Sequence, residues 1–507
     1  MIELTGKTLT FEELIRVARR GERAAIAKRA HAPMDRARAY VEQKLDEGAA
    51  VYGLTTGFGK FSDTYISRAD AEILQRKLIM SHACGMGEPL PEDAARAVML
   101  LRANALCQGH SGIRRSTVEA LLALLNAGVY PVIPEKGSLG ASGDLAPLAH
   151  MALVLMGEGE AFYSGERLPG AEALRCAGLA PVVLAAKEGL ALINGTQVMT
   201  AVGALAACDA RELCLTADVA CALTIEALLG ITKAFDPRVH ALRPHAGQGA
   251  SAANLLRLLA GSSLAKDIQP GRVQDAYSLR CAPQVHGACR DAVDYVLSAA
   301  EIEMNSVTDN PLVFPDGEEA VSGGNFHGEP MALAFDFLGI AVSELADISE
   351  RRTERLVNPA LSNGLPAFLT RRGGLNSGFM IAQYAAASMV SENKVLAHPA
   401  SVDSIPSSAN QEDHVSMGTT AAKKAASILD NARKVLAIEL AAACQALYLR
   451  GGEGLAPATR AVYDEVRKAV PPVEEDVIMY PYLNAAEALV KSGEVNAAVR
   501  RACPGLL

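Results

Sequence analysis

Residues 333–356 read LAFDFLGIAVSELADISERRTERL, where apolar side chains recur every three or four positions and charged ones lie between them. This spacing is typical of a long amphipathic helix with one buried face. The long helices that the same pattern predicts span 208–235, 287–304, 330–357, 377–396 and 419–450. Helices of this length usually bury their apolar faces against one another, within a subunit or between subunits. The sequence therefore predicts a mostly α protein with a long-helix bundle core, and we expect an oligomer.

The pattern changes along the chain and suggests three regions. Residues 1–200 combine shorter helices with glycine-rich loops and form a predicted N-terminal helical and loop region. Residues 201–450 form the predicted central bundle, and residues 451–507 a helical tail. Thr10 followed by Glu13 predicts a capping box that opens the first helix. Asp236-Pro237 is expected to end the helix over 208–235.

Composition excludes several classes of protein. The chain has 507 residues, a net charge of −9 and a pI near 5.7, which argues against a nucleic-acid or anionic membrane surface. Its start lacks the apolar core of a signal peptide. The longest uncharged run, 189–208, contains Asn194, Thr196 and Gln197, so we expect a buried segment rather than a membrane span.

Cysteine and histidine spacing gives no metal site. The ten cysteines contain no CxxC pair, which makes a zinc site or a disulfide framework improbable. No histidine or carboxylate cluster has metal-ligand spacing in the sequence, and no metal is expected. We expect a cytoplasmic protein with reduced thiols.

One glycine-rich loop, GSLGASGDLAPL at 137–148, allows more than one interpretation. Glycine and serine are normal turn residues, and Asp144 could cap the helix that follows. A second loop, GLTTGFGKF at 53–61, superficially resembles a phosphate-binding loop around Lys60. Its glycines are one residue too far apart, and Phe61 stands where serine or threonine is required.

Other short motifs in the chain decide between the interpretations of the loop at 137–148. GSLGASGDLAPLAH, EGLALINGTQ, QDAYSLRCAPQVHG, TDNPL, GGNFHG and NQEDHVSM occur together, in the order found in the aromatic amino acid ammonia-lyases. The chain resembles this family from about Tyr52 to about Arg450. Within the family it is most similar to members that act on histidine.

The resemblance implies a cofactor made from the chain itself. Ala141, Ser142 and Gly143 would cyclise autocatalytically into 4-methylidene-imidazol-5-one (MIO). The nitrogen of Gly143 would attack the carbonyl of Ala141, and two waters would leave, one carrying that carbonyl oxygen and one carrying the hydroxyl of Ser142. These residue types suit the step, because glycine does not obstruct ring closure and serine can leave a methylidene group.

The resemblance also implies roles for other residues. Tyr52 matches the acceptor of the β-proton, a role that needs a lowered pKa. Arg280 matches the residue that binds the substrate carboxylate, which a guanidinium grips through two parallel hydrogen bonds. The residues that match neighbours of the substrate or the electrophile are Asn194, Gln274, Tyr277, Asn325 and Phe326.

Two positions carry the expected choice of substrate. Ser81-His82 and Glu412 match the ring-facing residues of the family. An imidazole offers one N–H donor and one nitrogen acceptor, so Glu412 can accept from the ring and His82 can complete the match. The resemblance therefore implies conversion of L-histidine to trans-urocanate and ammonia by a homotetramer with active sites shared between subunits.

Three alternatives remain at this point. The same cofactor serves tyrosine and phenylalanine ammonia-lyases and 2,3-aminomutases. A non-catalytic helical scaffold with an inert Ser142, or a nucleotide-binding protein that uses Lys60, would need no cofactor.

Overall fold

The computed structural model describes residues 1–48 and 70–507, which group into two compact units. The first unit comprises Met1–Leu205, Leu297–Asp336 and Pro399–Lys423, and the second comprises Ala206–Val296, Phe337–His398 and Lys424–Leu507. Both are mainly helical, which confirms the predicted fold class. The division into residues 1–200, 201–450 and 451–507 stays a prediction.

The first unit combines short helices with small sheets. Its shorter helices are α1 (Phe11–Arg20), α2 (Lys28–Asp46), α3 (Ala71–His82), α4 (Glu92–Leu106), α5 (Arg115–Ala127), α6 (Leu145–Leu155), α7 (Gly170–Cys176) and α8 (Glu188–Ile193). The 3₁₀ turns η4 (Pro315–Gly317) and η6 (Ser408–Asn410) lie in its later segments. Thr10 and Glu13 form the predicted capping box at the start of α1, which confirms that local prediction.

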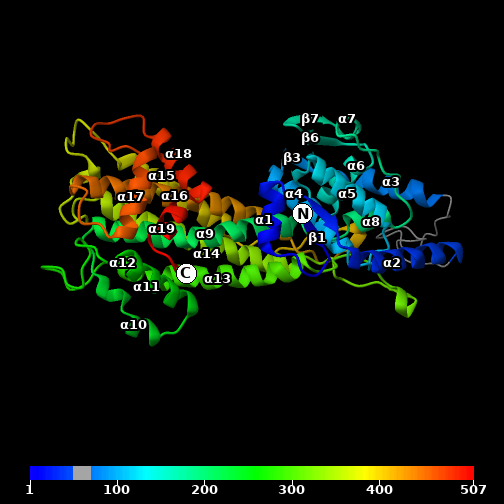
Figure 1. Cartoon of the computed structure of the whole chain (residues 1–507), viewed down its shortest axis with the longest axis horizontal. Helices are drawn as coiled ribbons and strands as arrows, with labels where there is room; N and C mark the ends of the chain where they lie inside the picture. The colour runs from blue at the N-terminus through cyan, green and yellow to red at the C-terminus, as the bar shows by residue number, and fades with distance from the viewer. Residues whose placement is uncertain (49–69) are drawn as a thin grey trace. The chain divides into compact units, whose positions relative to one another are not determined.

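The sheets of the first unit have two or three strands each. The parallel pair is β1 (Ile2–Leu4) with β2 (Ala24–Ile26), and the antiparallel groups are β3 (Met86–Pro89) with β5 (Pro134–Lys136), β4 (Val129–Pro131) with β6 (Glu160–Tyr163) and β7 (Glu166–Pro169), and β8 (Leu312–Phe314) with β9 (Glu319–Val321). Figure 1 shows the hairpin of β6 and β7 beside α7. These short strands connect helices and leave the core of the unit helical, as in α4, which is buried from Ala94 to Leu106.

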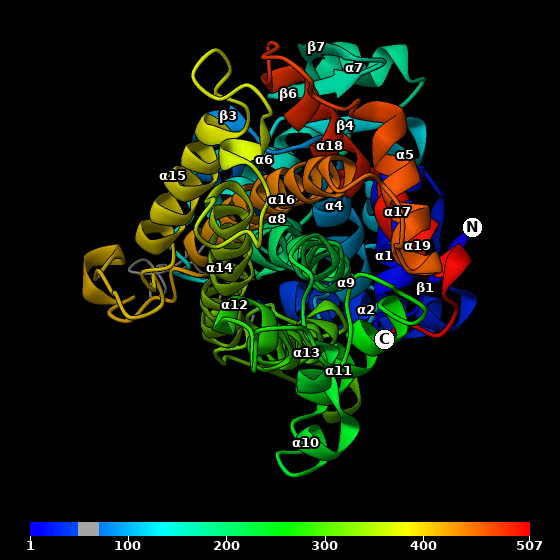
Figure 2. The same cartoon turned by 90° about the vertical axis from the view of Figure 1, so that its left-hand side faces the viewer.

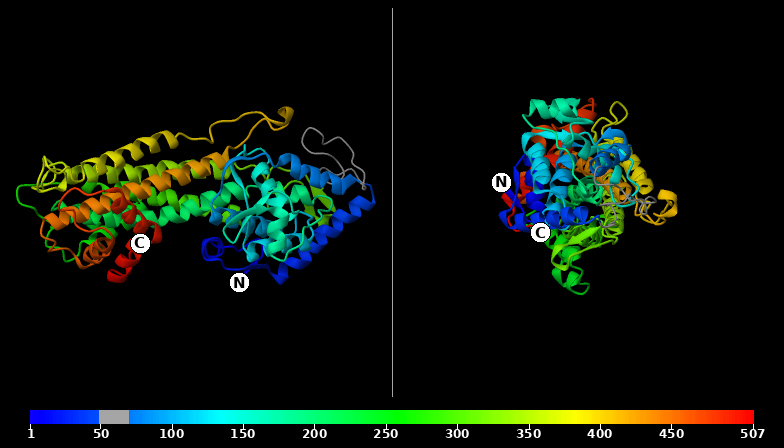
Figure 3. Two further views of the ribbon diagram at one scale, coloured as in Figure 1. Left: turned by 90° about the horizontal axis from the view of Figure 1, so that it is seen from above. Right: turned by 90° about the vertical axis from the view of Figure 1, so that its right-hand side faces the viewer.

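The second unit is a bundle of long helices. It contains most of α9 (Gln197–Ala227), α13 (Ala282–Met304), α14 (Glu329–Val357) and α16 (Gly418–Leu449). Its other elements are η3 (Thr232–Phe235), α10 (Pro237–Ala241), α11 (Ala246–Leu258), α12 (Tyr277–Arg280), η5 (Ala367–Leu369), α15 (Met380–Leu396), α17 (Pro457–Ala469), α18 (Tyr480–Ser492) and α19 (Glu494–Ala502). Figure 2 looks along the bundle and shows α9, α13, α14 and α16 side by side. In Figure 3, α15 runs alongside α16, where Asn431 Nδ2 donates to Asn393 Oδ1 over 3.0 Å.

The apolar stripe of residues 333–356 is the buried face of α14 in the bundle. Leu338, Val342 and Leu345 on this stripe are fully buried. The stripe continues to Arg352, whose guanidinium forms a bidentate pair with Glu439 of α16 at 2.5 and 2.7 Å. Both side chains of the pair are fully buried, so the bundle encloses a charge pair as well as apolar side chains.

Other helices satisfy the remaining bonding capacity of Glu439. Thr224 on α9 donates to one carboxylate oxygen over 2.8 Å, and Ser349 on α14 donates to the other over 2.7 Å. The carboxylate therefore joins three helices of the bundle. A buried charge is tolerated in proteins when it is paired and hydrogen-bonded in this way.

The boundaries predicted for the helix over 208–235 are wrong. The observed helix, α9, begins at Gln197 and ends at Ala227. Its end is set by Leu229, which has a left-handed φ of 53° that interrupts the helix. Asp236-Pro237 does not end α9. It follows the 3₁₀ turn η3, which ends at Phe235, and Asp236 also caps α10 by accepting from Arg238 N over 3.0 Å, with the proline at the first helical position.

The helices of the described residues were compared with the requirements of a membrane span. No helix in residues 1–48 and 70–507 has the length and apolar character needed to cross a membrane.

All ten cysteines are free thiols, and most are buried. Burial raises the pKa of several of these thiols, for example that of Cys221 to about 12, which keeps them protonated and unreactive.

Replacing Glu439 with alanine should destabilise the protein by about 3–5 kcal/mol, because it leaves Arg352 charged and unpaired inside the bundle. The matched control is Arg500→Ala, which removes an ion pair to Glu212 whose side chains are each 50% exposed. We expect that control to cost about 0–1 kcal/mol. Urea unfolding of the two variants measures the difference, and equal costs would contradict this account of the bundle.

Candidate active site

The loop around Ser142 has a tightly folded backbone. Ser142 has a φ of 53° and Gly143 a φ of 76°, and Gly140 and Gly143 form an isolated bridge across the turn. A Cβ atom at Gly143 would overlap the carbonyl oxygen of Gly195. Only glycine therefore fits at 143, and the loop lies directly against the backbone of the segment that follows α8.

The carboxylate of Asp144 holds this loop in place. Asp144 is fully buried, and its backbone N–H donates to Gly195 O over 2.7 Å. One carboxylate oxygen accepts from Val198 N at 2.9 Å and from Met199 N at 2.8 Å. The interpretation of Asp144 as a cap for the helix that follows it is wrong, because it makes no such bond to α6 and instead caps the N-terminus of α9.

Side-chain hydroxyls complete the bonding of Asp144. Ser138 Oγ donates to its other carboxylate oxygen over 2.8 Å, and Thr419 Oγ1 donates to the same atom. Burial raises the pKa of Asp144, and these hydrogen bonds oppose that rise by stabilising the ionised form. The positive end of the α9 dipole favours the same charge.

Asn194 lies in the apolar environment predicted for it and retains an unused acceptor. The residue is 4% exposed. Its backbone carbonyl accepts from Arg102 Nη1 over 2.8 Å, while its side-chain Oδ1 is buried and has no hydrogen-bond partner among the described residues. A buried polar atom without a partner is costly, so this atom is suited to bind a group that the chain does not yet present.

Sequence reasoning missed Arg102. Its guanidinium is fully buried and also donates to Gln197 Oε1 over 2.7 Å, so it fixes both sides of Gly195. Burial lowers the pKa of Arg102 to about 10. The available signal was an arginine within the mostly apolar run VMLLRANAL of α4.

A buried ion pair lies close enough to Arg102 to influence its charge. Lys187 Nζ and Asp309 Oδ2 are 3.0 Å apart, and both side chains are fully buried. Burial lowers the pKa of Lys187, the Asp309 charge raises it, and the Arg102 charge lowers it again. Arg102, Lys187 and Asp309 therefore interact as one buried group of charges.

Glu412 is brought to the Ser142 loop from a distant part of the sequence. Its Oε1 accepts from Ser142 Oγ over 3.4 Å, and its Oε2 accepts from Ser407 Oγ over 3.1 Å. The backbones of Ser407 and Glu412 exchange both hydrogen bonds, at 2.9 and 3.2 Å. The turn between these two residues therefore presents the carboxylate to Ser142.

His82, at the end of α3, has a defined orientation. Its Nδ1 lies 2.8 Å from the carbonyl oxygen of Leu78, and because a carbonyl only accepts, this nitrogen carries the hydrogen. Burial lowers the pKa of His82, with the Leu78 bond and the charge of Glu412 acting in the opposite direction. The neutral ring therefore presents Nε2 as an acceptor, and Glu412 is near enough to influence it.

The remaining predicted residues divide between the units. In the first unit, Asn325 is exposed and its Nδ2 donates to Val307 O over 3.2 Å, and Phe326 beside it is half-buried. In the second unit, Arg280 Nε donates to Asp275 O over 2.9 Å, and its guanidinium lies 4.6 Å from the ring centroid of Tyr277.

The second-unit residues expose polar groups that a ligand could use. Tyr277 is 70% exposed, and Gln274, three residues before it, is also exposed. Arg280 is half-buried and donates to Asp275 O through Nε. Tyr52 and Lys60 fall outside the described residues.

Replacing Gly195 with alanine should destabilise the protein by about 2–3 kcal/mol, because the new methyl group would overlap Gln197 Oε1 and Arg102 Nη1. Gly249→Ala is the matched control, since that glycine lies in α11 with open space around its Cβ position. Alanine there should be neutral or stabilise by up to about 1 kcal/mol. Chemical denaturation compares the two, and a Gly195→Ala protein as stable as the control would refute the packing described here.

Comparison with known proteins places this geometry in a wider group. The family description "Aromatic amino acid lyase" matches residues 9–468. A histidine ammonia-lyase of Alkaliphilus metalliredigens is 60% identical over 489 residues, covering 96% of each chain. The crystal structure of histidine ammonia-lyase from Trypanosoma cruzi has a TM-score of 0.93 at 45% identity, covering 99% of this chain and 96% of that one.

A structure named for a different reaction is equally similar in fold. Tyrosine aminomutase from Streptomyces globisporus has a TM-score of 0.96 at 39% identity, with both chains covered completely. Extensive identity to several relatives and a family match over most of the length agree with the resemblance carried by the six sequence strings. The chain belongs to the aromatic amino acid lyase family.

Proposed function

We propose that this chain is a histidine ammonia-lyase, which eliminates ammonia from L-histidine to give trans-urocanate. The observation that carries the proposal is the 3.4 Å contact between Ser142 Oγ and the Glu412 carboxylate. It joins the residue expected to form the electrophile to a residue expected to select the substrate ring. The relatives from Alkaliphilus metalliredigens and Trypanosoma cruzi that carry this name support the substrate.

We propose further that Ala141, Ser142 and Gly143 cyclise into MIO. The residues present suit that group, because the backbone at Ser142 and Gly143 is already folded into a turn and Gly143 has no room for a side chain. Asn194, whose Oδ1 is buried without a partner, directly precedes Gly195, the residue whose backbone lies against Gly143. The finished group would supply an electrophile that captures the substrate amine and makes it a leaving group.

The residues of the first unit then have distinct tasks. Arg102 and Asp144 hold the backbone on both sides of the loop, so that the reacting atoms keep their positions. Glu412 accepts from the substrate ring N–H, whereas the Nε2 of neutral His82 is also an acceptor and can pair with a second ring N–H only when the substrate imidazole is protonated. Asn325 and Phe326 remain candidates for the walls of the substrate site.

Residues of the second unit and of the undescribed segment complete the proposed mechanism. Arg280 binds the substrate carboxylate, and Gln274 and Tyr277 assist it through their exposed polar groups. Tyr52 removes the β-proton. Orientation of the substrate by several side chains turns a bimolecular encounter into a positioned reaction.

We propose that the protein assembles as a homotetramer whose active sites combine residues of several subunits. Large apolar side chains of the second unit support association, because Phe337, Ile340, Ile381 and Tyr384 are 42–60% exposed on α14 and α15. Exposed apolar side chains grouped on neighbouring helices often mark a protein interface. Mass measurement of the native assembly determines the number of subunits.

A second candidate is a tyrosine aminomutase, favoured by the fold likeness to the Streptomyces globisporus protein. Separate incubation with L-histidine, L-tyrosine and L-phenylalanine, followed by ultraviolet absorbance of the conjugated acid, distinguishes the two. We expect turnover of L-histidine alone. Conversion of L-tyrosine to its β-isomer, detected by chromatography, would replace the proposed function with the second candidate.

Ser142→Ala should abolish turnover, because alanine has no hydroxyl to eliminate. Intact-mass measurement should find the wild-type chain two waters lighter than its sequence and the variant at its full mass. Active wild-type protein of unmodified mass would contradict the proposed cofactor. An inactive wild-type chain of unmodified mass would favour the helical scaffold.

Glu412→Gln should lower kcat/KM for L-histidine roughly 10- to 100-fold, the effect of losing a hydrogen bond to a charged group worth about 1.5–3 kcal/mol. The matched control is Glu453→Gln, at an exposed glutamate of the second unit. That control should keep wild-type kinetics. Unchanged kcat/KM in Glu412→Gln would exclude this carboxylate from substrate recognition.

A further inference from the structure

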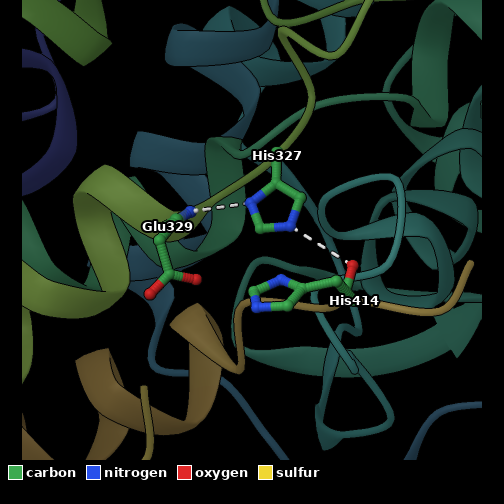
Figure 4. Close-up of side chains that lie close together, drawn as sticks. All are labelled: His327, Glu329 and His414. Carbon is green, nitrogen blue, oxygen red and sulfur yellow. Dashed lines mark hydrogen bonds between the residues drawn. The ribbon is translucent and has the colours of Figure 1, made fainter. Parts of the chain in front are cut away.

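A cluster of possible metal ligands lies in the first unit, formed by His327, Glu329 and His414. Within residues 1–48 and 70–507 these three bring one potential ligand atom each to within 4.8 Å of one another. Figure 4 shows the His327 ring between the start of α14, which carries Glu329, and the segment before α16, which carries His414. His414 is 85 residues or more from the other two, so sequence spacing could not reveal the group.

The hydrogen bonds of His327 leave one ring nitrogen suited to a metal. Its Nε2 lies 3.3 Å from the carbonyl oxygen of His414, and because that oxygen only accepts, Nε2 carries the hydrogen. Nδ1 therefore holds the lone pair, and it accepts a long 3.3 Å bond from the backbone N–H of Glu329. Metal-binding histidines usually donate their other N–H to a carbonyl or carboxylate in this way.

Glu329 supplies an independent sign that a ligand is missing. Its Oε2 is buried and has no hydrogen-bond partner among the described residues. A carboxylate oxygen removed from water without a partner is costly, and a bound cation offsets that cost. The carboxylate thus faces the two histidines with bonding capacity to spare.

His414 can approach the other two ligands by rotation of its side chain. The rings of His327 and His414 lie 5.5 Å apart between centroids, tilted by 32°. Zinc–ligand bonds of about 2.0–2.2 Å in tetrahedral geometry require ligand atoms roughly 3.3 Å apart. The exposed His414 side chain can rotate to shorten its separation from the other two.

We propose that His327 Nδ1, the Glu329 carboxylate and a His414 ring nitrogen bind one Zn²⁺ ion. Two imidazoles with one carboxylate suit zinc or a similar transition metal, whereas Mg²⁺ and Ca²⁺ prefer oxygen ligands only. A fourth position would remain for water.

The ion would connect the substrate-selecting turn to the start of α14. His414 follows Glu412 by two residues, and Glu329 opens the helix that follows Asn325 and Phe326. Zinc would therefore fix the position of the Glu412 carboxylate. This consequence rests on the proposed function, whereas binding of the ion does not.

The test uses the full chain, freed of metal with a chelator and then titrated with ZnCl₂ in competition with a chromophoric zinc indicator. We expect one tight site per chain. Glu329→Gln and His414→Asn should each weaken binding at least about 10-fold, as loss of a ligand or its partner does. The matched control, His245→Asn, changes an exposed histidine of the second unit and should bind like wild type.

Co²⁺ substitution and thermal unfolding give readouts that do not depend on activity. The wild-type protein with Co²⁺ should show visible absorbance of a four-coordinate site, and Zn²⁺ should raise its unfolding temperature. Both effects should be absent from His414→Asn, which is exposed and should fold normally.

Two outcomes would overturn the proposed site: zinc binding equal in wild type and both ligand variants, or no tight binding in the wild type. Zinc binding without turnover of L-histidine would support the zinc site but refute the proposed function. If zinc binds but the KM for L-histidine is the same in the metal-free and the zinc-bound protein, only the proposed effect on Glu412 would be refuted.

Discussion

The buried carboxylate of Asp144 is the interaction on which the candidate site depends. It accepts hydrogen bonds from Ser138 in its own loop, from the first N–H groups of α9 and from Thr419 at the start of α16. A charge held away from water is stable only when such donors surround it. Because the donors come from three separate segments, one side chain fixes the Ser142 loop relative to two helices. The loop therefore has this geometry only when all three segments are in place.

The contact between Gly143 and Gly195 shows how closely the chain must approach itself for this purpose. Two backbones meet there without side chains between them, and Arg102 holds the second from below through the carbonyl of Asn194. The buried cations Arg102 and Lys187 interact with the carboxylate of Asp309, while the buried carboxylate of Asp144 binds the backbone from Gly195 to Met199. Charged groups of both signs therefore hold this segment and fix the geometry of the loop.

The sequence predicted elements whose causes are local. The capping box of Thr10 and the stripe of residues 333–356 appear in the structure as expected, because each depends on neighbours within a few residues. The start of α9 was placed eleven residues too late, since the N–H groups of its first turn are bound by Asp144, far away in the sequence. The proximity of Ser142 and Glu412 followed only from the family resemblance, because no periodicity links residues 270 positions apart. Sequence analysis did not identify Arg102, because an arginine within an apolar run does not show which distant groups it binds.

The segment from Ser407 to Met417 explains why fold alone does not define the substrate. The segment contacts the Ser142 loop twice: Glu412 accepts from Ser142 Oγ, and Met417 N donates to Leu139 O over 3.3 Å. Relatives named for histidine and tyrosine chemistry share the fold with TM-scores of 0.93 and 0.96, so one overall backbone fold accompanies both names. Substrate choice must then lie in side chains presented to that shared backbone, as function generally does on a common fold. Because Glu412 is carried on a turn closed by Ser407 rather than on a helix or strand, exchanges in this segment can alter the pocket without disturbing the contacts of Asp144.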